Sequence, residues 1–137
     1  APGEFVEAVE VPVPAAGTHF AVHKISKRRD EDITAVLGAF HVRIDDGKFA
    51  FARIAYGGMA ATPKRAKAVE AALTGRPWTM ETVEAAMDAY ALDFSPLTDM
   101  RASAEYRLLV AKNLLKRFFI ETTGTRKPFT VTRYEAA

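Results

Sequence analysis

The spacing of apolar residues changes part-way along this chain, and that change constrains the fold more than any other feature. Before Gly57, apolar residues tend to alternate with polar ones, which is the period of a β-strand. After Gly58 they recur at roughly every third or fourth residue, which is the period of an amphipathic helix. Strands followed by helices are typical of α+β domains, in which helices pack on one side of an antiparallel sheet. We therefore expect an α+β fold.

A β-hairpin is the clearest local signal in the first half of the chain. Residues 33–44 form an apolar-rich strand whose first half is apolar on both faces, as in a strand covered on both sides. The Asp46-Gly47 pair that follows favours a tight hairpin turn, because glycine adopts positive φ without a steric penalty. Residues 48–56 then provide the return strand.

Weaker strand signals lie outside this hairpin. The alternation over residues 4–13 predicts a strand, and Pro12 and Pro14 confine it to a sheet edge or end it, because proline has no N–H to donate. Residues 20–25 predict a second, short strand. The stretch PFTVTRY, residues 128–134, predicts one more short strand near the C-terminus.

Three helices are predicted in the second half of the chain. The first should have Thr62 as its N-cap and Pro63 at its first helical position, which is the favoured order, and should end at Gly75. The second should start from an N-cap at Thr79. The third and longest covers about residues 103–122, and its apolar stripe is wider than a lone surface helix requires.

Composition limits what this chain can do. Its 137 residues form one domain of ordinary globular composition, and the net charge of +2 indicates no strong attraction to nucleic acid. The absence of cysteine excludes disulfides, thiolate nucleophiles and Cys-ligated zinc or iron–sulfur sites within these residues. No apolar stretch approaches the roughly 20 residues that cross a bilayer, and no signal-peptide pattern is present, so we expect a cytoplasmic protein.

A run of six charged residues precedes the strand at 33–44. Three cations are followed by three anions, so the run is nearly neutral and suits an ordered loop that pins itself better than a tail for an anionic polymer. We expect Asp32 to anchor this loop to Arg28 or Arg29. The six residues are Lys27, Arg28, Arg29, Asp30, Glu31 and Asp32.

Other candidate sites are weak. The three histidines lack metal-ligand spacing, and Asp93 and Asp99 are interpreted as loop and capping residues instead of paired acid–base carboxylates. A less favoured interpretation is that the helix start at Thr62, with Lys64 and Arg65 beside it, binds an anion through its free N–H groups. The sequence therefore predicts no catalytic residue and no metal ligand in this chain.

Four segments together resemble one family. The segments are KISKRRDEDITAVLGAF, ARIAYGGMAATPKRA, ALTGRPW and DFSPLTDMRASAEYRLLVAKNLLKRFF. They are similar to the C-terminal domain of the FAD-binding subunit of xanthine dehydrogenase, within the molybdenum hydroxylase flavoproteins that include carbon monoxide dehydrogenase. The resemblance covers about residues 4–124, and the bacterial form with separate subunits matches best.

The resemblance implies a fold and a role. The family domain is a small three-stranded antiparallel sheet packed against three helices, and it forms one wall of a site for FAD and NAD. Electrons from purine oxidation at a molybdenum cofactor pass through iron–sulfur clusters to FAD, which reduces NAD+. The implied partners are an upstream FAD-binding domain, which we expect to be missing here, an iron–sulfur domain and a molybdenum-binding large subunit. Alone, the chain should be inactive.

One residue acquires a cofactor role from the resemblance. The lysine of the family segment K-x-x-(R/K)-R-R-(D/E) contacts the flavin ring, and Lys24 occupies that position here. A fixed ammonium near the flavin carbonyls favours the reduced ring. We expect Phe20 and Val22 to face the core, which leaves Lys24 on the polar side or at the end of its strand.

Two alternatives from other functional classes stay open. One is a small free-standing module that binds RNA or another anion through residues 27–29 and 64–67, although acidic residues lie among these cations and no aromatic stacking platform accompanies them. The other is a purely assembly role, in which the wide apolar stripe of the third helix packs on a neighbouring subunit.

Overall fold

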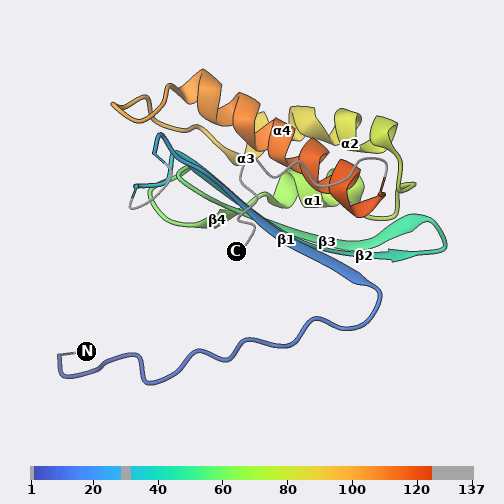
Figure 1. Ribbon diagram of the computed structural model, residues 1–137, viewed down its shortest axis with the longest axis horizontal. Coiled ribbons are helices and arrows are strands. Elements are labelled where there is room, and N and C mark those ends of the chain that lie inside the picture. Colours follow the sequence, from blue (N-terminus) through green and yellow to red (C-terminus); the bar gives the residue numbers. More distant parts are fainter. Residues whose placement is uncertain (1, 29–31, 125–137) are drawn as a thin grey trace, which may run out of the picture.

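The computed structural model describes residues 2–28 and 32–124, and within them one antiparallel sheet carries all the helices on one face (Figure 1). The strands are β1 (Thr18–Ile25), β2 (Val36–Asp45), β3 (Lys48–Gly57) and the two-residue β4 (Lys64–Arg65), in the spatial order β1-β2-β3-β4. The predicted α+β class is confirmed, with one short strand more than the three expected.

The helical half of the chain forms three segments that cover the sheet. They are α1 (Lys67–Leu73), a middle segment made of α2 (Met80–Ala86), the 3₁₀ turn η1 (Met87–Ala89) and α3 (Tyr90–Asp93), and the long α4 (Ala104–Thr122). The Thr79 side chain caps α2 by accepting from the Thr82 N–H, as predicted, and Ser103 caps α4 in the same way.

The central hairpin agrees with the sequence prediction. Asp46 and Gly47 have φ angles of 49° and 68°, and positive φ at both central residues is what a two-residue type I′ turn requires. On β2, Val36, Phe40 and Val42 are buried beneath the helices, while the alternate side chains lie on the opposite face. The strand period therefore determined which side chains share a face.

The predicted start of the first helix is wrong. Thr62 and Pro63 precede β4 instead of capping a helix, because Lys64 and Arg65 pair with the edge of β3. Helix α1 begins at Lys67, and its first N–H groups are bound by a carboxylate from the distant residue Asp93. The less favoured interpretation of Thr62 as an anion-binding helix terminus therefore has no structural basis.

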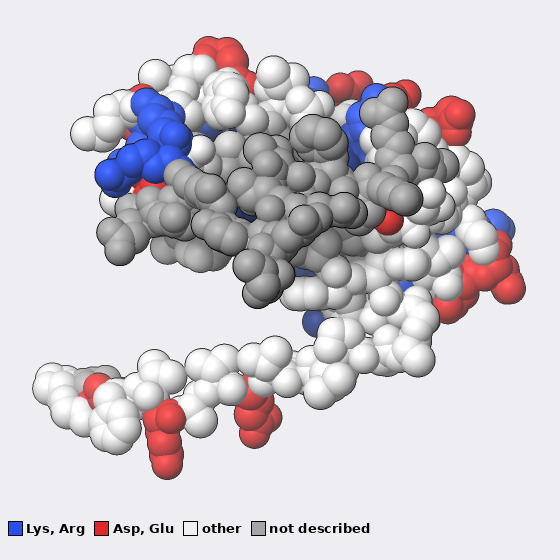
Figure 2. Space-filling view, in the orientation of Figure 1, with Lys and Arg blue, Asp and Glu red and all other residues white. Residues whose placement is uncertain are grey.

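The predicted strand over residues 4–13 is also absent from the structure. Residues 2–17 run away from the body without strand pairing. Figure 1 shows this segment standing clear of the sheet, and Figure 2 shows acidic side chains along it. Its apolar side chains are 76–91% exposed: Phe5, Val6, Val9, Val11 and Val13. Alternation is not sufficient for a strand, because the backbone also needs a neighbouring strand to pair with. The strand predicted at residues 128–134 lies outside the described residues.

The core lies between the sheet and the helices. Phe118 of α4 stacks on Phe40 of β2 with 5.0 Å between ring centroids, and Trp78 packs on Phe49 and Phe119 with 4.7 Å between centroids in each pair. Most of the apolar stripe of α4 is buried inside this chain. The stripe therefore cannot serve as the broad assembly surface considered above.

Candidate functional site

The face of the sheet opposite the helices is called here the outer face, and no helix of the described residues covers it. Phe20 and Val22 of β1 lie on it with 59% and 50% of their surface exposed, and Lys24 lies beside them. The expectation that Phe20 and Val22 face the core is wrong. His23, on the other parity, is the buried side chain of this strand. A strand's alternation shows which residues share a face but not which face the helices cover.

Lys24 stands at the end of β1, on the outer face and exposed to solvent. In the sheet it pairs with Leu37 of β2, and its Nζ donates a hydrogen bond of 2.9 Å to the carbonyl oxygen of Asp32. This places the Lys24 ammonium on a surface that another molecule or domain can reach. It is not buried against the interior of its own chain.

Asp32 organises the charged loop that follows β1. Its Oδ2 accepts the backbone N–H groups of Lys27 and Arg28 at 2.8 and 2.9 Å. The bond from the Arg28 N–H is the largest of several contributions that hold the pKa of the Asp32 carboxyl below its usual value. The Arg28 guanidinium lies 3.9 Å from the same carboxylate, so the predicted anchoring by Asp32 is confirmed. Arg29 lies outside the described residues.

An open cleft of about 1230 Å³ lies next to the end of the loop that follows β1. Asp32 and Leu37, the two residues that Lys24 contacts or pairs with, both line it. Its lining also includes Ala39, Ala55 and Gly57, which lie on the outer face at neighbouring positions of β2 and β3. These residues are small and apolar, so no large side chain projects from the sheet in this part of the cleft. A flat aromatic group could lie against it. The turn after β3 and the segment at residues 93–101 form the remaining walls.

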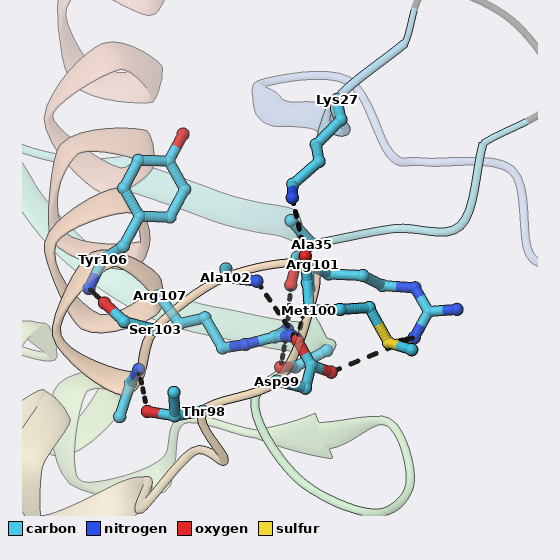
Figure 3. A network of polar contacts seen from close by, with 12 residues as sticks. Lys27, Ala35, Thr98, Asp99, Met100, Arg101, Ala102, Ser103, Tyr106 and Arg107 are labelled. Atoms are coloured by element: carbon cyan, nitrogen blue, oxygen red, sulfur yellow. Dashed lines mark hydrogen bonds and ion pairs between the residues drawn. The ribbon is translucent and has the colours of Figure 1, made fainter.

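Arg107 is a buried residue of this region that the sequence interpretation missed. Only 4% of its surface is exposed, and its guanidinium binds the carboxylate of Asp99 at 2.7 Å (Figure 3). The sequence contained a signal for this burial. Arg107 lies at helical spacing from three residues that face the core: Ala111, Leu114 and Phe118. An arginine within such a stripe indicates a buried partner.

Asp93 and Asp99 have the structural roles that were predicted for them. The Asp93 carboxylate accepts the Ala68 N–H at 3.0 Å and the Val69 N–H at 3.1 Å, and so satisfies the N-terminus of α1. Asp99 accepts the backbone N–H groups of the two residues at positions 101 and 102. These bonds, followed by that from Arg107, lower the pKa of Asp99 to about 2.

The cations proposed for an RNA-binding module are engaged within the chain. Lys27 donates to the carbonyl oxygen of Met100 at 2.6 Å, Lys64 donates to the carbonyl oxygen of Asp93, and Arg65 pairs with Glu70 at 2.5 Å. The Arg65 charge is thus paired with a carboxylate, and the two lysine side chains are held by bonds to backbone carbonyl groups. Within residues 2–28 and 32–124, no cluster of three or more histidine, aspartate or glutamate side chains forms a metal site. No helix in that part of the chain has both the length and the apolarity to cross a bilayer.

Comparison with known families shows which family has this domain. The model of the CO dehydrogenase flavoprotein C-terminal domain matches residues 21–122, which contain Lys24, its loop, the cleft and Arg107. The chain belongs to this family. The family flavoproteins are components of molybdenum hydroxylases, so the predicted resemblance is confirmed.

Individual relatives support the assignment. The chain is 33% identical over 110 residues to the putative xanthine dehydrogenase FAD-binding subunit of Escherichia coli strain K12, covering 80% of this chain and 37% of the relative. It is 32% identical over 114 residues to the carbon monoxide dehydrogenase medium chain of Hydrogenophaga pseudoflava, covering 83% of this chain and 39% of the relative. The chain thus spans about two fifths of the length of these relatives.

A solved structure has the same fold. Carbon monoxide dehydrogenase from Hydrogenophaga pseudoflava, in a form lacking the Mo-pyranopterin moiety of its molybdenum cofactor, superposes with a TM-score of 0.71 at 39% identity. The match covers 78% of this chain and 37% of that one. The sheet and the helices are therefore those of the family fold.

Proposed function

We propose that this chain is the C-terminal domain of a molybdenum hydroxylase flavoprotein subunit of the xanthine dehydrogenase type, and that it forms one wall of an FAD and NAD site. The observation that carries the proposal is the position of Lys24. Its side chain is exposed on the sheet face that no described helix covers, and its ammonium binds the carbonyl oxygen of Asp32, a residue that lines the cleft.

The residues of the cleft fit a flavin ring. The surface formed by Ala39, Ala55 and Gly57 accepts a flat aromatic system, and Leu37 supplies apolar contact beside Lys24. No glycine-rich pyrophosphate loop is present in this chain, so the phosphate-binding part of such a site comes from elsewhere. When bound, FAD supplies the redox centre through which electrons pass from the oxidised substrate to NAD+.

Lys24 has the donors that such a site needs. A lysine ammonium carries three N–H donors, and one of them is used by the Asp32 carbonyl. Two donors remain for the polar edge of the flavin ring. The contact to Asp32 also orients the side chain before a ligand arrives, which reduces the entropy lost on binding.

The partner domains and the substrate of the whole protein are inferred from the relatives. We propose that the domain works beside an upstream FAD-binding domain, an iron–sulfur domain and a molybdenum-binding large subunit in the cytoplasm, and that the substrate is a purine. A xanthine dehydrogenase subunit and a carbon monoxide dehydrogenase subunit match this chain about equally in identity, so the purine assignment needs its own assay.

Replacing Lys24 tests the proposal. In protein that includes the flavin-binding region, Lys24→Ala should lower the flavin midpoint potential by roughly 30–60 mV, because a charge-assisted hydrogen bond contributes about 1.5–3 kcal/mol and about 1.4 kcal/mol corresponds to 30 mV for two electrons. Spectroelectrochemical titration measures the potential, and stopped-flow kinetics measures NAD+ reduction. Lys48→Ala, at the opposite end of the sheet, is the matched control. An unchanged potential and rate in Lys24→Ala would exclude the assigned role.

A further inference from the structure

The loop that holds Lys24 in place is closed by contacts at its base. The Ala35 N–H donates to the carbonyl oxygen of Ile25 at 2.9 Å, which joins the last residue of β1 to the residue before β2. Between these two positions, Asp32 contacts Lys24 and Lys27. The direction of the Lys24 side chain therefore depends on how this loop is held against the rest of the domain.

Arg107 binds the base of that loop from the helical layer. Its Nη1 donates to the carbonyl oxygen of Ala35 and, at 2.8 Å, to the carbonyl oxygen of Gly58, and its Nη2 donates to Asp99 at 2.7 Å (Figure 3). The three acceptors come from three separate segments. A planar guanidinium with fixed donor directions can bridge them, whereas a lysine ammonium, as a single point charge, cannot do so in the same geometry.

A second contact reaches the same loop through Asp99. Besides Arg107, Asp99 Oδ1 binds the backbone N–H groups of Arg101 and Ala102 at 2.8 and 3.1 Å, and so shapes the turn that contains Met100. The Met100 carbonyl oxygen accepts the Lys27 ammonium at 2.6 Å. Arg107 thus holds the Lys24 loop directly at its base and indirectly at Lys27.

Two of the acceptors of Arg107 also border the cleft. Gly58 and Asp99 line it, and Arg107 itself reaches its wall. The Nε of Arg107 is buried without a hydrogen-bond partner in the described part of the chain, so the bonds of this side chain are concentrated at its terminal nitrogens. Two of the three acceptors of Arg107, Gly58 and Asp99, therefore lie at the cleft, and the third, Ala35, lies at the base of the Lys24 loop.

We propose that Arg107 is a positioning residue, which fixes the Lys24 loop against the Gly58 turn and the Asp99 segment and thereby sets where the Lys24 ammonium meets a bound flavin. The second part of this proposal rests on the proposed function. The first part concerns only the loop and can be tested without FAD.

The first test measures amide hydrogen exchange in the Lys24 loop and needs only this chain. Amide hydrogen exchange at Lys27 and Arg28, whose N–H groups bind Asp32, should become about ten-fold faster or more in Arg107→Lys, because loss of a hydrogen bond to a charged group costs at least that factor. Leu115→Ala is the control, since Leu115 is buried in the core on the same helix, eight residues after Arg107. The control should destabilise the protein without selectively accelerating exchange at these two amides.

The second test measures the midpoint potential of the flavin, in protein that includes the flavin-binding region. Arg107→Lys should shift the flavin midpoint potential in the same direction as Lys24→Ala, and the double variant should shift it no further than Lys24→Ala alone, because both act through one ammonium. Leu115→Ala should leave the potential unchanged.

The outcomes separate this inference from the proposed function. Unchanged exchange at Lys27 and Arg28 in Arg107→Lys overturns the inference, whatever the flavin does. Additive potential shifts in the double variant overturn it as well. If Lys24→Ala leaves the flavin unaffected, the proposed function fails, and the exchange measurement still decides whether Arg107 positions the loop.

Discussion

Gly58 packs directly against the carbonyl oxygen of Ala35: a Cβ atom on Gly58 would lie 2.3 Å from that oxygen and 3.2 Å from Nη1 of Arg107. Gly58 also has a φ of +78°, which L-residues with a side chain rarely adopt. Two independent constraints therefore require glycine at this point, where the turn after β3 meets the base of the Lys24 loop.

Gly58→Ala should lower the free energy of unfolding by about 2–5 kcal/mol, combining the cost of a left-handed backbone with that of displacing a backbone oxygen. Gly75→Ala is the matched control, because Gly75 has a φ of +79° but nothing within 4 Å of its Cβ position. It should cost only about 1–2 kcal/mol. Urea denaturation measures both losses, and equal losses would show that the contact with Ala35 is unimportant.

Tyr56 and Tyr90 form a buried hydroxyl pair beneath α4. Their oxygens are 2.6 Å apart, and Tyr56 donates to the carbonyl oxygen of Ala111 at 2.8 Å, which leaves Tyr90 as the donor to Tyr56. Burial raises the pKa of both phenols, so both hydroxyls are protonated at neutral pH.

Tyr56→Phe should destabilise the protein by about 1–3 kcal/mol, because it leaves the Ala111 carbonyl and the Tyr90 hydroxyl without their partner. Tyr90→Phe should cost less, since Tyr56 keeps its bond to Ala111. The double variant should be about as stable as Tyr56→Phe alone, and a double-mutant cycle by chemical denaturation measures this coupling. Fully additive losses would argue against the pair.

His23 should make stability dependent on pH. Burial is the main reason that the pKa of His23 lies below its usual 6.5; Arg117 lowers it further and Glu121 opposes the shift. Its Nε2 lies 3.4 Å from Glu121 Oε2 without a hydrogen bond, and Glu121 is already paired with Arg117 at 2.7 Å. The folded state consequently takes up this proton at lower pH than the unfolded state.

The contribution of His23 to stability is therefore present above its unfolded pKa and is lost as the pH falls through the folded pKa. Urea midpoints measured from pH 7.5 down to about 5 should fall more steeply in the parent protein than in His23→Gln. Glu121→Gln should steepen the fall, because Glu121 favours the charged imidazolium. Parallel profiles for the parent and His23→Gln would rule out this contribution.

The sequence by itself determined the features that depend on neighbouring residues. The hairpin at Asp46-Gly47 follows from the positive φ that this pair tolerates, and the starts of α2 and α4 follow from Thr79 and Ser103, whose side chains cap N–H groups three residues ahead. The same reasoning identified Asp32 as the anchor of its loop. In these cases both partners lie within a few residues, so no knowledge of the fold was needed.

Only the tertiary structure decided the features whose partners are distant in sequence. Helix α1 starts at Lys67 because β4 pairs with β3 and because Asp93, more than twenty residues away, supplies its capping carboxylate. The face of β1 that carries Lys24 points outward because α4 covers the other face. The alternation of side chains along a strand is the same whichever of its two faces the helices cover. Arg107 is buried because its three acceptors converge only once the sheet, the turn after β3 and the segment before α4 have come together.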